Sequence, residues 1–269
     1  MDPHNAVPLV VIGGGQMARA LVGGMIAGGR PAESITVIDH SDESIDWWQT
    51  NMASVHATTD AAAGQADAAV LLAVKPGVVR SVSESRDFAG QLVVSIAAGV
   101  SLGKLQSWIG HGRVVRVMPN TPSLVGAGAA GYAVGPEVTE ADGHLIDQML
   151  GAVGLCVRVD ESLINAVTAV SGSGPAYVCM IVEAMADGGV AAGLPRAMSQ
   201  RLAAQTVMGT AKMILQDGRH PGQLKDAVAS PGGTTIAAIE SLEMSGVRAA
   251  MMSAVAAAKR RADEMDQGS

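Results

Sequence analysis

Short apolar runs alternate with helical patterns along the first 160 residues of the chain. Runs rich in Val, Ile and Leu, each bounded by turn residues, predict β-strands at 8–13, 34–39, 68–74, 91–98 and 113–118. Because these runs are apolar throughout instead of alternating, we expect strands buried on both faces, as in a parallel sheet. Helical patterns such as 16–28 and 42–51 lie between them, and 155–160 predicts one more strand that would close the sheet. This alternation indicates a doubly wound α/β sheet.

After Asp160 helical patterns replace the strands. They predict helices at 161–170, 175–192, 195–216, 222–229 and 235–264, the last interrupted near Gly246. These helices are rich in Ala and Met and carry few charges, so they can hardly cover their own apolar surface and call for partner helices from a second copy. We therefore divide the chain into an α/β domain, residues 1–160, and an all-α domain, residues 161–269.

Composition narrows the class of protein. The net charge of −7 argues against nucleic-acid binding. The longest uncharged stretches, 117–136 and 162–182, are broken by Gly and Pro, which argues against a membrane span, and the first residues do not resemble a secretory signal. Cys156 and Cys179 have no partner spacing and are interpreted as reduced core cysteines, and the six histidines show no metal-binding spacing. These features predict a soluble, cytoplasmic protein without a metal.

The segment VIGGGQMARAL (11–21) joins the first predicted strand to the first predicted helix. Gly13 would allow the tight turn, Gly15 would let the backbone approach a pyrophosphate, and Ala18 would let helix and strand pack closely. The helix start at Gln16 and Met17 would then offer backbone N–H groups to the phosphates. This setting predicts a Rossmann-type, dinucleotide-binding domain, against the alternative of an ordinary Gly-rich turn.

Residues at the end of the second predicted strand bear on the choice of coenzyme. Asp39 stands where a carboxylate commonly accepts hydrogen bonds from the adenosine ribose hydroxyls of NAD. His40 and Ser41 follow at once, and both could contact the 2′-phosphate of NADP instead. The sequence therefore predicts NADPH or NADH as the coenzyme and leaves the preference open.

Two further strand ends should border the same cleft, because ligands of such sheets lie beyond the carboxyl ends of the strands. AVKPG places Ala73, Val74, Lys75 and Pro76 there. Lys75 could act as a general acid, but a lysine that shapes the turn or meets the ribose is the stronger alternative.

VRVMPNTP (115–122) ends another strand and brings Met118 and Asn120 to the cleft. Asn120 could hydrogen-bond the nicotinamide or a substrate, and it could equally cap the turn.

The second half of the chain contains the most specific motifs. AVTAVSGSGPAY (166–177) and PGQLKDAVASPGGTTIAAIESLE (221–243) resemble segments of pyrroline-5-carboxylate reductases, and the second matches the family's C-terminal signature along its length. VIGGGQMARAL, AVKP and VMPNTP support them in the expected order and spacing. The chain thus resembles a pyrroline-5-carboxylate reductase from about residue 8 to 265.

The resemblance implies a Rossmann-type domain followed by a helical dimerisation domain, in homodimers that often assemble into decamers. It implies hydride transfer from NADPH or NADH to the C=N carbon of 1-pyrroline-5-carboxylate, which gives L-proline in the last step of proline biosynthesis. The substrate would lie where the coenzyme cleft meets the helical dimer. A cyclic imine that enters protonated is already electrophilic, so positioning and electrostatics are the main tasks of the protein.

Two turns offer donors for the substrate carboxylate. The resemblance assigns it to the backbone and hydroxyl groups of Ser171, Gly172, Ser173 and Gly174, and of Gly232, Gly233 and Thr234. Ser173 and Thr234 are the strongest side-chain candidates, followed by Thr235; helix capping is the alternative role.

Glu161 matches a family carboxylate near the substrate nitrogen, although a Glu at a helix start also compensates the helix dipole. Two positions depart from the family. Val178 stands where some relatives use a Thr as a substrate contact, and Asp39-His40-Ser41 replaces a common Asn-Arg-Ser. The second departure puts the usual tolerance for NADPH in doubt.

Two other functions compete with this one. A hydroxyacid dehydrogenase of similar build would need a Lys or His base in the helical domain, and none occurs between Asp160 and Ala211. A protein that binds the dinucleotide without chemistry would differ from the enzyme only in turnover.

Overall fold

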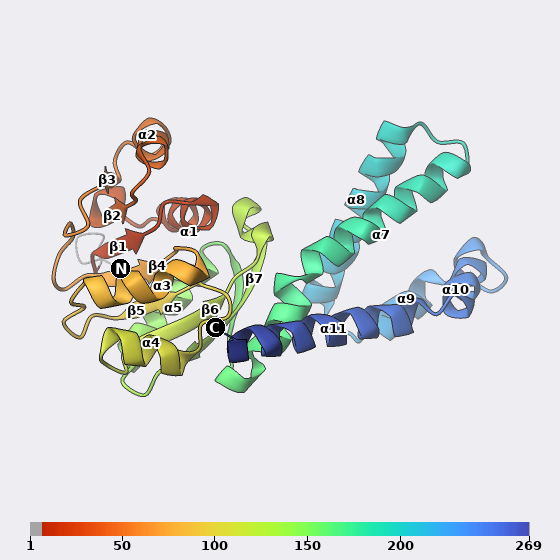
Figure 1. Ribbon diagram of the computed structural model, residues 1–269. Helices are drawn as coiled ribbons and strands as arrows, with labels where there is room; N and C mark the ends of the chain where they lie inside the picture. The colour runs from red at the N-terminus through yellow and green to blue at the C-terminus, as the bar shows by residue number, and fades with distance from the viewer. Residues whose placement is uncertain (1–6, 269) are drawn as a thin grey trace. The chain divides into compact units, whose positions relative to one another are not determined.

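The computed structural model describes residues 7–268 and divides into two compact units (Figure 1). The first unit extends to Ser173 and includes the residues from Ala258 onward, and the second is Gly174–Ala257. These contact-based limits differ from the sequence-based boundary at residue 160, because 161–173 and the end of the last helix pack on the sheet.

The first unit is built on an eight-stranded sheet with helices on both faces (Figure 1). The strands are β1 Leu9–Ile12, β2 Ile35–Ile38, β3 His56–Thr58, β4 Ala69–Leu72, β5 Val93–Ser95, β6 Val114–Met118, β7 Gly128–Val134 and β8 Gly154–Arg158. Their order is β3-β2-β1-β4-β5-β6-β7-β8. The doubly wound α/β fold is confirmed, and the predicted strand at 155–160 is β8 at the edge of the sheet. β6 and β7 pair antiparallel, so β7 and β8 run opposite to the other strands.

Strands β3 and β7 were not predicted, because β3 has only three residues and the sequence of β7 is rich in Gly and Ala instead of β-branched residues. The small residues are required by close neighbours. A Cβ at Gly131 would lie 2.7 Å from Cγ1 of Val167, and a Cβ at Gly128 would overlap the hydroxyl of Ser123. Because β7 needs small residues where it packs against distant segments, it lacks the β-branched residues by which a strand is usually recognised.

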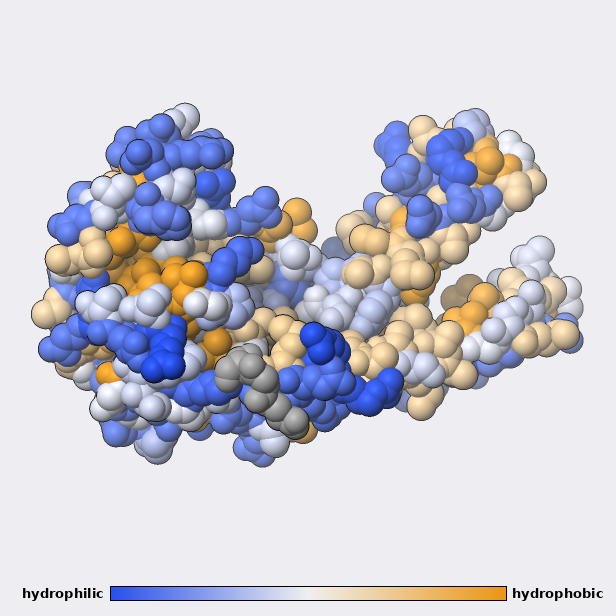
Figure 2. Space-filling model, viewed as in Figure 1, coloured by the Kyte–Doolittle hydropathy of each residue, from blue (hydrophilic) through white to orange (hydrophobic). Residues whose placement is uncertain are grey.

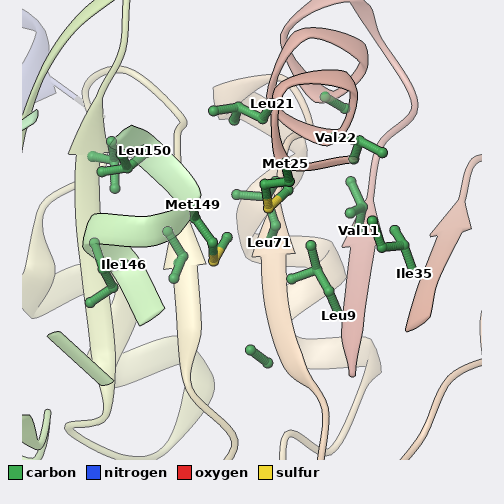
Figure 3. Close-up of a cluster of buried hydrophobic side chains, with 14 of the residues drawn as sticks. Leu9, Val11, Leu21, Val22, Met25, Ile35, Leu71, Ile146, Met149 and Leu150 are labelled. Atoms are coloured by element: carbon green, nitrogen blue, oxygen red, sulfur yellow. The ribbon is translucent and has the colours of Figure 1, made fainter. Parts of the chain in front are cut away.

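Two apolar cores lie on opposite faces of the sheet. One is covered by α1 (Gln16–Ala27), α2 (Asp42–Asn51) and α5 (Glu140–Gly151), and the other by α3 (Pro76–Ser85) and α4 (Leu102–Ile109). Figure 3 shows the first core, in which side chains of α1 and α5 meet those of the strands. The labelled residues are Leu9, Val11, Leu21, Val22, Met25, Ile35, Leu71, Ile146, Met149 and Leu150.

A polar cluster around Arg116 on β6 fastens both ends of the helical region to the sheet. The Arg116 side chain is 5% exposed and lies 3.1 Å from Asp266 and 3.4 Å from Glu161. Asn165 accepts a hydrogen bond from Arg116 at 3.3 Å and donates one to Asp266 at 3.0 Å. Glu161 and Asn165 precede the second unit in the chain, and Asp266 follows it. The segment before this unit and the segment after it are therefore both bound to the buried side chain of Arg116. The segments involved are η4 Glu161–Leu163, α6 Ile164–Val167, η5 Thr168–Gly172 and the end of α11.

The second unit contains helices only. They are α7 Gly174–Ala191, α8 Arg196–Asp217, α9 Pro221–Val228, α10 Thr234–Met244 and the first part of α11 Val247–Gly268. The residues that these helices bury in Gly174–Ala257 are Ala186, Ser199, Ala203 and Leu224. Large apolar side chains such as Met180, Met208 and Leu215 are exposed, and hydrophobic residues cover much of the surface of these helices in view (Figure 2). A unit with so small a core requires further apolar contacts for stability.

The structure corrects the interpretation of the two cysteines, and it bears on that of one long apolar segment. Cys156 is half-buried and Cys179 is exposed, both with free thiols, so the prediction of two core cysteines is wrong. The segment Glu161–Ala191 is long and apolar enough to cross a membrane by length and composition, and 11% of its most apolar window is buried.

Candidate active site

The glycine turn lies at the carboxyl end of β1, between β2 and β4. Gly13 has a φ of +100°, and a Cβ there would lie 2.7 Å from the carbonyl oxygen of Ala73. Gly15, by contrast, has no atom of the described residues within 4 Å of its would-be Cβ, and it begins α1 without a side-chain cap. The N–H groups of Gln16 and Met17, in the first turn of α1, have no acceptor within the helix. The turn has the geometry that a pyrophosphate site requires.

Asp39 follows β2 and is tied to the glycine turn. Its Oδ2 accepts the N–H of Gly14 at 2.6 Å, and its Oδ1 accepts that of Ser41 at 3.0 Å. Burial acts to raise the pKa of Asp39, but the backbone hydrogen bonds outweigh it and hold the pKa below its usual value. The side chain is therefore a fixed carboxylate that is charged at neutral pH.

His40 and Ser41 differ in how they are held. The His40 side chain is fully exposed, with Nδ1 3.4 Å from Oδ1 of Asp39. Ser41 is the N-cap of α2, and its Oγ accepts the N–H of Ser44 at 3.3 Å. His40 is thus free to turn toward a ligand, whereas the Ser41 hydroxyl already has a structural role.

The carbonyl oxygen of Gly14 is held by residues that no sequence pattern indicated. This oxygen accepts hydrogen bonds from Nε1 of Trp48 at 3.0 Å, Nε of Arg19 at 3.0 Å and Oγ of Ser44 at 3.3 Å. Ser44 and Trp48 lie one turn apart on the buried face of α2, which the helical pattern alone indicates only as an apolar face. Their effect is to fix the peptide that joins Gly14 to Gly15.

The predicted residues after β4 reach the same edge of the sheet. Ala73 donates its N–H to the carbonyl of Ile12 at 2.8 Å, which joins this strand end to the glycine turn. Lys75 is the exposed N-cap of α3 and Pro76 is its first residue. Val74, which lies between Ala73 and Lys75, is half-buried. The Lys75 side chain points to solvent, where either predicted role stays open.

Asn120 follows β6 and is 7% exposed. Its Oδ1 accepts the N–H of Ala129 at 2.9 Å, and its Nδ2 donates to the carbonyl of Ser171 at 3.0 Å. Met118 is half-buried, and its Cε would lie 2.6 Å from a Cβ at Gly172. The two residues that sequence analysis assigns to the coenzyme cleft thus touch the first of the two predicted substrate turns.

That first turn is a π-helical segment, η5, that leads into α7. The N–H of Ser173 donates to the carbonyl of Thr168 at 2.8 Å, five residues back. Ser171 uses its hydroxyl to donate to the carbonyl of Val167 at 3.0 Å. Gly174 then begins α7. Single π-helical turns of this kind occur frequently at functional sites.

The second predicted substrate turn belongs to the helical unit. Gly232 has a φ of +66°, and Gly233 is the N-cap of α10 without any side-chain cap. Thr234 is exposed and Thr235 is half-buried in the first turn of this helix. Like α1, α10 therefore begins with unpaired N–H groups beside a glycine.

Glu161 contacts the sheet unit in two ways. Its Oε1 accepts the N–H of Leu102, at the start of α4, at 2.6 Å and lies 3.4 Å from Nη1 of Arg116. The residue thus caps one helix and pairs with a buried cation, which are structural roles that its position at a helix start did not reveal.

The carboxyl ends of β1, β2 and β4 bring three predicted segments to one edge of the sheet: 13–17, 39–41 and 73–76. Ser171 joins them through Asn120, whereas Gly232–Thr235 lie in the other compact unit. Within residues 7–268, no group of three or more His, Cys, Asp or Glu side chains could hold a metal ion.

Two family descriptions match the chain. Residues 161–265 match the pyrroline-5-carboxylate reductase dimerisation family, and residues 8–99 match the family described as NADP oxidoreductase coenzyme F420-dependent. A pyrroline-5-carboxylate reductase of Arabidopsis thaliana is 43% identical over 270 residues, which cover 98% of each chain.

Solved structures agree with these matches. A pyrroline-5-carboxylate reductase of Coxiella burnetii superposes with a TM-score of 0.92 at 38% identity, over 97% of this chain and 99% of that one. The Plasmodium falciparum pyrroline carboxylate reductase, solved with NADP bound, superposes with a TM-score of 0.83 at 30% identity, over 97% and 98%.

Proposed function

The chain belongs to the pyrroline-5-carboxylate reductase family, and on that premise we propose how its residues bind and orient the reactants. As a pyrroline-5-carboxylate reductase it transfers hydride from NAD(P)H to the C=N bond of 1-pyrroline-5-carboxylate and forms L-proline, the last step of proline biosynthesis. The similarity over 98% of the chain carries this assignment. The test is the rate of NADPH and NADH oxidation with racemic pyrroline-5-carboxylate. Absence of turnover with both, by folded protein that binds the dinucleotide, would indicate a binding protein instead.

Backbone groups of the glycine turn would hold the pyrophosphate of the coenzyme. The uncapped start of α1 at Gln16 and Met17 supports this role, as does the open space beside Gly15. Ala73–Pro76 would border the nicotinamide ribose at the end of β4. The hydroxyl-rich turns at Ser171–Gly174 and Gly232–Thr235 would bind the carboxylate of the substrate.

The protonated cyclic imine needs no strong acid from the protein, so orientation is the main contribution of these residues. Lys75 and Glu161 are the ionisable groups for which the sequence left a part in proton transfer open. Lys75 is exposed, and Glu161 is already engaged with Arg116 and the start of α4. The main contribution is therefore expected from neutral hydrogen-bond donors.

Ser173→Ala and Thr234→Ala should each raise the KM for pyrroline-5-carboxylate by roughly tenfold to a hundredfold. A hydrogen bond to a charged group contributes about 1.5–3 kcal/mol, and the carboxylate would lose one. The KM for the coenzyme should stay within about twofold of the wild-type value, since these residues are not proposed to contact it. Steady-state kinetics with each substrate varied in turn measures both constants.

Ser81→Ala is the matched control, because this exposed serine of α3 donates only to the carbonyl of Val78. Equal effects of Ser81→Ala and Ser173→Ala, or unchanged KM values in both proposed site variants, would contradict the substrate assignment.

We also propose that the enzyme prefers NADH to NADPH. The carboxylate of Asp39 is held by two backbone N–H groups and is charged, so it can accept ribose hydroxyls and would repel a 2′-phosphate. The exposed His40 is the counter-argument, since it could pair with that phosphate.

Asp39→Asn should raise the ratio of kcat/KM for NADPH to that for NADH by at least about tenfold. This corresponds to about 1.4 kcal/mol of removed repulsion. Asp46→Asn, an exposed change on the same α2 helix, should leave the ratio unchanged. If the wild-type enzyme prefers NADPH and Asp39→Asn leaves this ratio unchanged, the choice of coenzyme would be assigned to His40 and Ser41.

The match to a dimerisation domain indicates a homo-oligomer. We propose a dimer formed through the helical domain, residues 161–269, which assembles further into a decamer in the cytoplasm. The exposed apolar side chains of α7 and α8 support a protein partner for this surface.

A further inference from the structure

The carbonyl group of Ser171 lacks the donor that a regular helix would provide. The Ser171 carbonyl would accept the N–H of residue i+4, Pro175, if the backbone continued as an α-helix, and that of residue i+5, Ala176, if it continued as a π-helix. Proline has no N–H. Nδ2 of Asn120 donates to this carbonyl at 3.0 Å, from a position 51 residues earlier in the chain. The Asn120 side chain thus supplies a donor to a carbonyl for which an α-helical continuation through Pro175 would supply none.

The same amide is fixed at its other end. Oδ1 of Asn120 accepts the N–H of Ala129 on β7 at 2.9 Å, and the residue is 7% exposed. A carboxamide presents an acceptor and a donor on one planar group, which this bridge requires. Asn120 therefore joins the start of β7 to the turn at Ser171.

Close packing holds the same turn on two sides. Gly172 approaches the Met118 side chain, and Val167 approaches Gly131 of β7, so closely that a Cβ at either glycine would lie within 2.7 Å of its neighbour. Packing sets how near the turn lies to the sheet, but van der Waals contacts are not directional. The hydrogen bond from Asn120 sets the direction of the Ser171 carbonyl and, through the peptide plane, that of the following N–H group.

We infer that Asn120 is a positioning residue that orients the turn at Ser171–Ser173 for the substrate carboxylate. This inference rests on the proposed function, in which that turn binds the carboxylate. The sequence left two roles open for Asn120: a hydrogen bond to the nicotinamide or a substrate, and capping of the turn. The inference favours a structural role, and it extends that role from capping to control of the substrate site.

Asn120→Asp removes the donor, and it also adds a negative charge at this buried position. Aspartate keeps the size of the side chain and the acceptor for Ala129, but it places an oxygen against the carbonyl of Ser171. We expect the KM for pyrroline-5-carboxylate to rise at least about tenfold and kcat to fall, because small misplacements of reacting groups reduce rates strongly. The Kd of the coenzyme, measured by fluorescence titration, should change less than about twofold.

Pro175→Ala provides the rescue. Alanine restores the N–H at the α-helical i+4 position of Ser171, so a continuous α-helix could satisfy the Ser171 carbonyl and the donor of Asn120 would become dispensable. In the Pro175→Ala background, Asn120→Asp should change the KM for pyrroline-5-carboxylate by less than about threefold, a coupling that a double-mutant cycle isolates. Pro221→Ala is the matched control, since Pro221 also lies in the first turn of a helix, α9, and should give no rescue.

Three results would overturn the inference: a rise in coenzyme Kd with an unchanged substrate KM, no rescue by Pro175→Ala, or equal rescue by Pro221→Ala. Melting temperatures of all variants separate these effects from unfolding. A separate result would show that the proposed substrate site is wrong. In that case Ser173→Ala and Thr234→Ala, with Asn120 unchanged, would have the kinetics of the wild-type enzyme. In that case, Asn120→Asp and Pro175→Ala would couple in melting temperature but not in substrate KM.

Discussion

Replacing Arg116 with methionine lowers the free energy of unfolding by about 2–4 kcal/mol. The guanidinium is 5% exposed, and its loss leaves the carboxylates of Asp266 and Glu161 without their cation. Methionine has a similar length, so little of the effect comes from a cavity. Both carboxylates are partly exposed, which keeps the expected loss below the upper range for a fully buried pair. Urea unfolding, with the midpoint and slope both recorded, measures the change.

Arg80→Met is the control for removal of an arginine charge. Arg80 pairs with Glu84 on the exposed side of α3, and its loss should change stability by less than about 0.5 kcal/mol. Adding Asp266→Asn to Arg116→Met should recover part of the loss, because one unpaired carboxylate is removed. A double variant that is as unstable as the sum of the single variants would show that the ion pair is not the cause.

Gly13→Ala should abolish measurable coenzyme binding and also lower the free energy of unfolding by about 2–4 kcal/mol. The φ of +100° is strained for any residue with a Cβ, and such strain alone contributes about 1–3 kcal/mol. The added Cβ would lie 2.7 Å from the backbone oxygen of Ala73, which cannot move without shifting β4. Titration of coenzyme fluorescence and thermal unfolding give the two readouts.

Gly15→Ala separates the two effects. Gly15 has an ordinary φ of −72° and open space around its Cα, so alanine should leave the melting temperature unchanged. The methyl group would nevertheless obstruct the approach of a pyrophosphate and weaken coenzyme binding roughly a hundredfold, about 2.7 kcal/mol. Equal losses of stability in Gly13→Ala and Gly15→Ala would contradict this account of the turn.

Local signals account for what could be predicted. The runs at 8–13, 34–39 and 68–74 became β1, β2 and β4, since buried parallel strands need continuous apolar residues. Two helix ends of the structure also have a local cause. Gly193 and Gly218 lie just after α7 and α8 and have positive φ, which glycine adopts without strain. The glycine turn was found because its spacing and its place between strand and helix are both local.

The missed features depend on partners far away in the chain. β7 lacks a strand signal because its glycines make room for Ser123 and Val167. The locking of Gly14 by Trp48, 34 residues later, could not be predicted from either segment alone. Nor could the capping of Leu102 by Glu161, 59 residues apart.

The sequence by itself determined the doubly wound sheet, its apolar strands, the glycine turn and, through its motifs, the family. These features follow from the hydrophobic periodicity and from glycines and prolines, which affect the backbone at their own positions in the chain. Only the tertiary structure decided that Asn120 supplies the donor that Pro175 lacks, and that Arg116 gathers Glu161 and Asp266. A polar side chain satisfies whichever buried group the fold brings within hydrogen-bonding distance, and that distance is set by packing between segments that no local pattern relates.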